Sequence, residues 1–199
     1  MKPNYAQARR HATRRLMREL SHKLSYHNLG HTLDVIERCI DLGELIGISD
    51  EQMLLVKTAA AYHDIGFLQK AQGHEALGAQ MAGEVLGGFG YSAEQIEAVQ
   101  ALIMATKLGH NPNNLLEKIM SDADLDILGR PDFLARSGDL HSEVVAMGEK
   151  VTALQWYAQQ HRFLSQHQYQ TDIAHQLRKR GKVMNIGLLA DLIQSDESK

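Results

Sequence analysis

Along most of the chain, apolar residues recur every three or four positions, which is the period of an α-helix with one buried face. Between Asn28 and Gly47, for example, the apolar residues at this spacing are Leu33, Ile36, Ile40 and Leu45. No segment of useful length alternates between apolar and polar residues as a half-buried strand does. We therefore expect an all-α fold, a single compact bundle of roughly seven to nine helices.

Two capping boxes mark where helices begin. Ser49 and Ser92 each stand three residues before a glutamine, Gln52 and Gln95, so that side chain and backbone satisfy each other at a helix start. The first box opens the segment 53–67, which is apolar nearly all round. A helix without a polar face is buried, so we expect this helix to be central.

The first helix is expected from about Tyr5 to Leu20 and at the surface. Its apolar stripe is narrow and consists of Leu16, Met17 and Leu20. It also carries five arginines, namely Arg9, Arg10, Arg14, Arg15 and Arg18. Contact with RNA, an anionic ligand or a neighbouring subunit is one interpretation, but a solvated helix face is the more common reason for such a run.

Composition narrows the class of protein. The 199 residues include 21 Lys and Arg against 24 Asp and Glu, a net charge of −3, so we do not expect a nucleic-acid partner. The single cysteine, Cys39, excludes an internal disulfide and suits a reducing compartment, so we expect a cytoplasmic protein. No apolar run is long enough to span a bilayer, and association with further copies of the chain is left open. The 11 histidines exceed the usual frequency, which indicates metal chemistry, acid–base chemistry or no special role.

The central helix contains His63 and Asp64 side by side. Neither belongs in a helix core without a reason, because an unpaired buried charge is very costly. A divalent metal ion would neutralise Asp64 and accept the lone pair of a neutral His63. A buried, hydrogen-bonded His–Asp pair without metal is the alternative.

Three aspartates lie in the otherwise apolar segment before Gly129. Asp122 and Asp126 are one helical turn apart and share a face, whereas Asp124 points to the opposite side. The three carboxylates therefore cannot all serve one site. We expect one of the two faces to be buried, and a buried carboxylate needs a cation.

The order of these residues resembles the HD-domain metal-dependent phosphohydrolases. Their pattern is a histidine, a His-Asp doublet and a distant aspartate, here His31, His63-Asp64 and Asp124. The surrounding segments are similar too: YHNLGHT, TAAAYHDIGF, HEALGAQMA and KIMSDADLDILG. The resemblance implies one domain over 1–199, with an HD-like metal-binding core over 26–129 and a helical extension over 130–199.

The resemblance also implies a site. It assigns one divalent ion to His31, His63, Asp64 and Asp124, with Asp122 as the alternate ligand or as a supporting residue. Two nitrogen and two oxygen donors favour Mn, Fe, Ni, Co or Zn over Mg.

Three residues are implied for the chemistry around that ion. Asp64 is expected to hold the attacking water, and His74 and Lys107 to neutralise the phosphate, although a lysine at a helix end is also common without such a role. His27 is expected to support a ligand or to face the substrate. A second ion is not expected. Relatives with two ions have another histidine in the helix before the last aspartate, whereas residues 105–107 of this chain include none, and His110 lies in a polar loop.

The expected activity is therefore hydrolysis of a phosphate ester, with a nucleotide as the substrate class, by attack of metal-bound water. A non-catalytic regulatory or ligand-binding HD module that keeps the metal is the alternative. A third possibility, a two-iron oxygenase, is disfavoured by the absence of a second-metal histidine before Asp124. The sequence has no glycine-rich phosphate loop of the Walker type.

Overall fold

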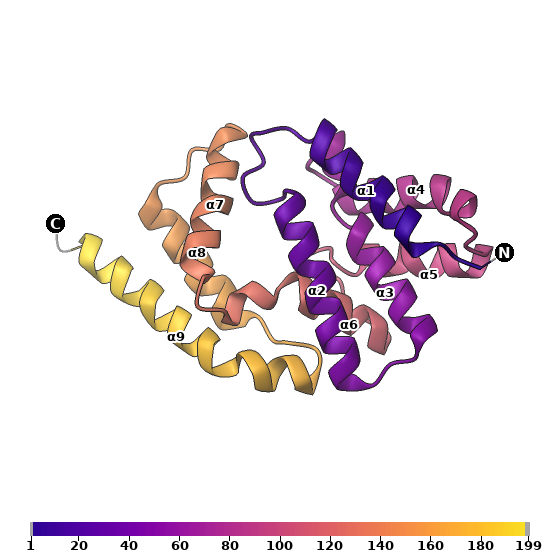
Figure 1. Ribbon diagram of the computed structural model, residues 1–199. Helices are drawn as coiled ribbons and strands as arrows, with labels where there is room; N and C mark the ends of the chain where they lie inside the picture. Colours follow the sequence, from indigo (N-terminus) through magenta and orange to yellow (C-terminus); the bar gives the residue numbers. More distant parts are fainter. Residues whose placement is uncertain (1, 198–199) are drawn as a thin grey trace. The chain divides into compact units, whose positions relative to one another are not determined.

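The computed structural model describes residues 2–197, and within them every regular element is a helix. The nine α-helices of this part of the chain confirm the all-α expectation (Figure 1). They are α1 (Tyr5–Glu19), α2 (Leu29–Ile46), α3 (Asp50–Tyr62), α4 (His74–Leu86), α5 (Ala93–Met104), α6 (Leu115–Asp124), α7 (Phe133–Ala146), α8 (Ala153–Gln166) and α9 (Asp172–Glu197). Three short 3₁₀ helices join them: η1 (Ile65–Leu68), η2 (Gly87–Phe89) and η3 (Asp126–Gly129). None of the helices in this range is both long and apolar enough to cross a membrane.

The helices form two compact units. The N-terminal unit contains Met1–Ser21 and His27–Asp124, and the C-terminal unit contains His22–Tyr26 and Leu125–Lys199. Within the N-terminal unit, α3 packs against α1, α2, α5 and α6, and α4 packs against α5 (Figure 1). The helix that ends at the His-Asp doublet is therefore the central one of its unit, as its apolar sequence predicts.

The helix starts follow the capping signals. Asn28 accepts hydrogen bonds from the backbone N–H groups of Gly30 and His31, which holds the first turn of α2. Both predicted capping boxes are formed, at Ser49 and at Ser92. These caps place the first residues of α2 and α3 at defined positions, and His31 lies in one of these turns.

Two of the predicted apolar stripes are shifted. The buried face of α2 runs through Val35, Ile36 and Cys39, whereas Leu45 is 58% exposed. In α1 the buried residues are Ala8, Ala12 and Leu16, while Met17 is exposed. The small alanines let α1 approach α3 closely, so its contact face lies further towards its N-terminus than the larger apolar residues suggest.

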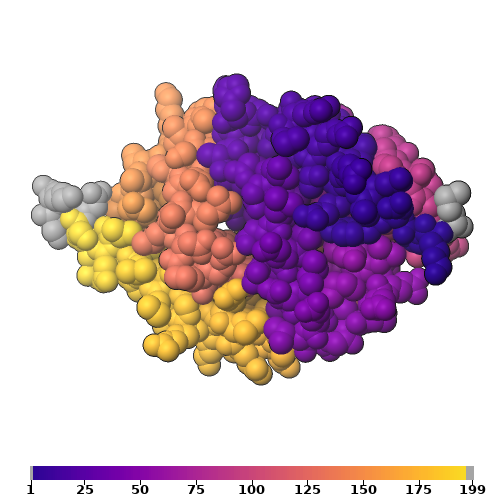
Figure 2. Space-filling view, viewed as in Figure 1, coloured from indigo at the N-terminus to yellow at the C-terminus, as the bar shows by residue number. Residues whose placement is uncertain are grey.

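The arginines of α1 agree with a solvated face. Arg10, Arg14 and Arg18 are exposed on one side of the helix, and Arg15 pairs with Glu19 at 2.7 Å. The space-filling view shows the outer side of α1, in indigo, at the surface (Figure 2).

The C-terminal unit has its own apolar core of Ile127, Leu128, Phe133, Leu164 and Leu189. Its η3 and α9 meet at two glycines, Gly129 and Gly181. A Cβ atom on Gly181 would lie 2.0 Å from the carbonyl oxygen of Gly129, so only glycine allows this approach.

Candidate metal centre

The His-Asp doublet lies in a buried turn just past the end of α3. The helix ends at Tyr62, so His63 and Asp64 follow it rather than stand within it as the sequence suggested. Both are buried, at 1% and 3% exposure. Tyr62 fixes this end of the helix, because its hydroxyl donates a hydrogen bond to the carbonyl oxygen of Ala8 in α1.

Close backbone packing follows the doublet. A Cβ atom on Gly66 would lie 2.0 Å from the carbonyl oxygen of His74, so η1 and the start of α4 touch through their backbones. Glycine is the only residue that permits this contact. It brings His74 towards Asp64: His74 Nε2 lies 3.6 Å from Asp64 Oδ1.

Two helix ends bring the other groups to the doublet. His31 comes from the first turn of α2 and Asp124 is the last residue of α6. His31 Nε2 lies 3.1 Å from Asp124 Oδ1 and 3.4 Å from His63 Nε2. Ligand atoms of His31, His63 and Asp124 all fall within 4.8 Å of one another, close enough for one ion. Asp64 Oδ2 faces the same cluster, 3.2 Å from His63 Nε2 and 3.6 Å from His31 Nε2.

The donor set fits a cation. His63 Nδ1 lies 2.8 Å from the carbonyl oxygen of Ala60, which can only accept, so Nδ1 carries a proton. In the neutral ring Nε2 then has a free lone pair, and it lies 3.2 Å from the buried Asp64 Oδ2. Two acceptors pointing at each other in a buried site are stabilised by a positive charge between them. The residues therefore fit a divalent metal ion.

The electrostatics of the doublet point the same way. Burial lowers the pKa of His63, but the charges of Asp64 and Asp124 outweigh it and raise the pKa to about 9. Burial favours the protonated form of Asp64, yet the neighbouring His63 holds the pKa of Asp64 well below its ordinary value. Without metal, a proton on His63 supplies the positive charge that the cluster needs.

The three aspartates lie in two elements, because α6 ends at Asp124 and Asp126 belongs to η3, so Asp122 and Asp126 do not share one helix as predicted. Asp124 faces His31 and His63. Asp126 belongs to the C-terminal unit and pairs with Arg178 there, at 2.6 Å and 2.8 Å. Asp122 is buried at 1% exposure. Asp126 is thus a buried carboxylate whose cationic partner is a guanidinium.

Comparison with known proteins bears on this arrangement. The family model described as "HD domain" matches residues 28–126, which include all four predicted ligands. The chain belongs to the HD-domain family. Most members of that family are metal-dependent hydrolases. A search of curated proteins found no match.

Two solved structures of Bacillus subtilis YpgQ, one of them in complex with ADP, have the fold of this chain. The ADP complex aligns over 96% of this chain and 97% of that one, at 19% identity and a TM-score of 0.66. The second structure covers 96% of both chains, at 21% identity and the same TM-score. The similarity extends beyond the HD domain, so the segment after residue 126 is also part of the shared fold.

An aromatic stack lies beside the metal-ligand cluster of the HD domain. The ring of Phe67 stacks on His74 with centroids 4.0 Å apart and on His27 with centroids 4.4 Å apart. The sequence placed His27 and His74 near the site but gave no role to Phe67. Its position directly after the doublet and Gly66 was the available signal.

Lys107 and His110 are not among the residues whose ligand atoms meet in the cluster. Lys107 is exposed in the turn after α5, and among residues 2–197 it forms no ion pair. His110 contacts Glu117 at 3.1 Å, and Glu117 also accepts from the backbone N–H of Asn113. His110 therefore orders the loop before α6 in the HD domain.

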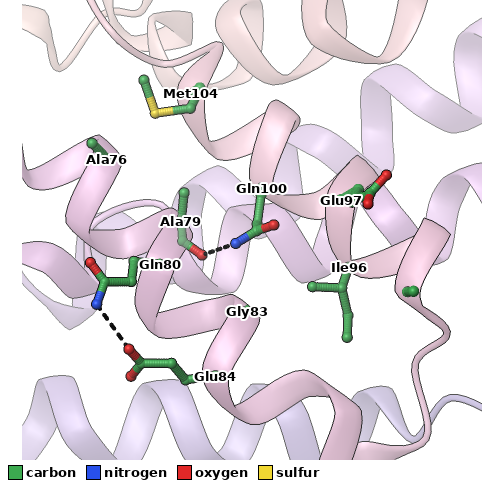
Figure 3. Close-up of a pocket in the computed structure, with 10 residues that line it drawn as sticks. Ala76, Ala79, Gln80, Gly83, Glu84, Ile96, Glu97, Gln100 and Met104 are labelled. Carbon is green, nitrogen blue, oxygen red and sulfur yellow. Dashed lines mark hydrogen bonds between the residues drawn. The ribbon is translucent and has the colours of Figure 1, made fainter.

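Solvent reaches the cluster from one side. The side chains of His31, His63 and Asp64 are at most 5% exposed, whereas those of Asp124 and His74 are each 18% exposed. A substrate would therefore approach along Asp124 and His74. A separate surface groove of about 670 Å³ lies between α4 and α5, lined by small residues such as Ala79 and Gly83 (Figure 3). No histidine lines it, and Gln100 spans it to donate to the carbonyl oxygen of Ala79 at 2.9 Å.

Proposed function

We propose that this HD domain is a metal-dependent phosphohydrolase that cleaves a phosphate ester of a nucleotide. The observation that carries the proposal is the convergence of His31, His63 and Asp124, whose ligand atoms lie within 4.8 Å of one another beside the buried Asp64. A hydrogen-bonded His–Asp pair accounts for His63 and Asp64 alone, whereas a divalent cation also accounts for His31 and Asp124 in the same cluster.

In this proposal His31, His63, Asp64 and Asp124 hold one ion. When bound, the ion lowers the pKa of a coordinated water and polarises a phosphoryl oxygen. The carbonyl oxygen of Ala60 keeps His63 in the tautomer that offers Nε2.

Asp64 has two separate contacts in this arrangement. Its Oδ2 faces His63, whereas its Oδ1 lies 3.6 Å from His74 Nε2. The Oδ1 atom therefore orients the nucleophilic water and accepts its hydrogen bond. No serine or cysteine nucleophile is needed, and Cys39 is unsuited because burial raises the pKa of its thiol.

His74 is proposed to stabilise the negative charge of the phosphoryl group. Its Nδ1 donates to the carbonyl oxygen of Ala71 at 2.9 Å, so its Nε2 donates to a phosphate oxygen only when the ring is charged. Phe67 holds this ring in place. Lys107, which is exposed in the turn after α5, is proposed as a further positive charge for the phosphate.

The choice of a nucleotide rests on two supports. The ligand cluster opens at Asp124 and His74, where an anionic substrate meets the His74 imidazole. YpgQ, which shares the fold over nearly the whole chain, was crystallised with ADP. We infer that the substrate of this protein also carries a phosphate on a nucleoside.

Metal analysis followed by a phosphate-release screen tests the proposal. The purified full chain is stripped with chelator, reloaded with Mn²⁺, Co²⁺, Ni²⁺, Zn²⁺ or Mg²⁺, and assayed on nucleoside mono-, di- and triphosphates. We expect about one ion per chain and metal-dependent release of phosphate that acquires ¹⁸O from labelled water. His63→Ala should lose both metal and activity, whereas His22→Ala, which removes an exposed histidine elsewhere, should keep both.

Full activity after verified metal removal would exclude the proposed reaction. One bound ion without activity on any phosphate ester would instead favour the non-catalytic HD module. A phosphorylated side chain trapped by acid quench would exclude direct attack by water.

A further inference from the structure

A second cluster of basic side chains lines a pocket of about 330 Å³ within the C-terminal unit. One wall is formed by residues 164–169, at the end of α8 and just after it, and the other by one face of α9. His175, Lys179 and Lys182 recur on α9 at intervals of four and three residues, so they share the wall. No aspartate or glutamate lines the pocket.

Lys182 is the most constrained of these groups. Its Nζ atom donates a hydrogen bond to the carbonyl oxygen of His167 and lies 5.7 Å from the centroid of the Tyr169 ring. Both neighbours are uncharged, and within residues 2–197 no carboxylate pairs with Lys182. Because no counter-charge offsets its burial, the pKa of Lys182 is lowered. A partly buried ammonium without a counter-charge is stabilised when an anion enters.

His167 lies on the same positive side. Burial and the nearby charge of Lys182 lower its pKa to about 4, so its ring is neutral at physiological pH. Its buried Nδ1 atom makes no hydrogen bond. The neutral imidazole therefore does not add to or cancel the positive charge of the two lysines. Its Nδ1 atom adds a polar group without a hydrogen bond at the edge of the pocket.

The pocket also has apolar surface. Leu164 is fully buried beneath it, and Ile186 and Val183 continue this surface along α9. Small-molecule sites combine apolar walls with a few convergent polar groups, and a cavity of this volume is at the lower end of their range.

We propose that this pocket binds a small phosphorylated molecule, with its phosphate between Lys179 and Lys182 and an aromatic or aliphatic group on Val183 and Ile186. Two ammonium groups on one helix face match a dianionic phosphate. The proposal is independent of the metal centre, since every group that it uses lies in the C-terminal unit.

Calorimetric titration of the full chain with phenylphosphonate tests the proposal. The phosphonate carries the required dianion and aromatic ring, and its P–C bond is not cleaved by a phosphate-ester hydrolase. Chelator is present, so that binding to metal does not contribute. We expect saturable 1:1 binding, competition by inorganic phosphate, and amide chemical-shift changes in residues 164–169.

Two variants distinguish specific binding in the pocket from non-specific attraction of the phosphonate to a basic helix. Lys179→Met should weaken binding about tenfold, the loss expected for one good charge contact. Arg180→Met removes the same charge from the same helix but lies outside the pocket, so it should leave the dissociation constant unchanged. Lys182→Met should also weaken binding, and its thermal unfolding is measured because Lys182 also caps the end of α8.

Three results would overturn the proposal. The first is no saturable binding up to about 10 mM, which is weaker than a specific site allows. The second is an unchanged dissociation constant in Lys179→Met, or an equal loss in Arg180→Met. The third is a set of shift changes confined to residues around His31, which would place the phosphonate at the metal centre.

Discussion

Arg178 and Asp126 form a two-point ion pair within the C-terminal unit, with Nε–Oδ1 at 2.6 Å and Nη2–Oδ2 at 2.8 Å. Asp126 is buried at 3% exposure, so this guanidinium is its main counter-charge. The pair links η3 to α9, two elements 52 positions apart in sequence. It also removes Asp126 from the set of candidate metal ligands.

Arg178→Met should destabilise the protein by about 3 kcal/mol, because the buried Asp126 then keeps only the more distant Arg130, whose Nη1 lies 3.9 Å from its Oδ2. Urea unfolding of the variant measures the change. The double variant Asp126→Asn/Arg178→Met should recover part of the loss, since no charge is then left buried. Arg180→Met, on an exposed part of α9, serves as the control and should change stability little. An unfolding free energy of Arg178→Met equal to that of the wild type would show that the pair contributes nothing.

Asp124→Asn should lower bound metal far more than Asp122→Asn does. Asp124 offers a carboxylate oxygen 3.1 Å from His31 Nε2, and loss of its charge weakens the site that the two imidazoles complete. Elemental analysis of the two purified variants after equal metal loading compares them. The larger loss in Asp122→Asn would move the ligand assignment to that residue.

Metal affinity should rise with pH up to about 9. His63 must lose a proton to offer Nε2, and its pKa in the metal-free chain is raised to about 9, chiefly by the charge of Asp64 against the effect of burial. The dissociation constant should therefore fall by about tenfold per pH unit below that value. Competition with a chelator of known affinity between pH 6 and 9 measures the slope, and a flat profile would contradict a protonated His63.

The stability of the metal-free chain should change with pH in the opposite sense. The pKa of His63 is higher in the folded chain than in the unfolded one, so its protonation stabilises the fold. This contribution is complete below about pH 6.5 and is lost as the pH rises through about 9. Urea unfolding in chelator across this range should show the loss in the wild type and not in His63→Asn.

Gly66→Ala should damage the site although it removes no ligand. The added Cβ would meet the backbone of His74 at 2.0 Å, so η1 and α4 must separate, at a cost of about 1–3 kcal/mol. We expect a lower melting temperature and reduced metal content. Gly88→Ala is the matched control, since a Cβ there has nothing within 4 Å. Equal behaviour of the two variants would mean that the close approach has no role in holding His74.

Much of the fold was predictable because helical periodicity and caps are local signals. Asn28, Ser49 and Ser92 each act at the helix start that the sequence assigns to them. The shifted stripes of α1 and α2 were not predictable in the same way. Whether Ala12 or Met17 is buried depends on how closely a neighbouring helix approaches, which a single helix does not determine.

The ligand order was readable, but the contacts around it were not. His31, His63, Asp64 and Asp124 stand in recognisable segments, and the structure brings them together. The stack of Phe67 on His74 depends on a backbone contact between η1 and α4. The partner of His110 likewise depends on a loop that turns back to Glu117.

The separation of His31 from Asp124 has a consequence for how the chain folds. The two residues are 93 positions apart, and an ion that holds both would act as a cross-link across that length of chain. Closing so long a loop is among the slower and more entropically demanding steps of folding. An ion that dissociates slowly would keep the loop closed through transient openings of the helices. Loading with metal should therefore slow unfolding and proteolysis more than it speeds folding.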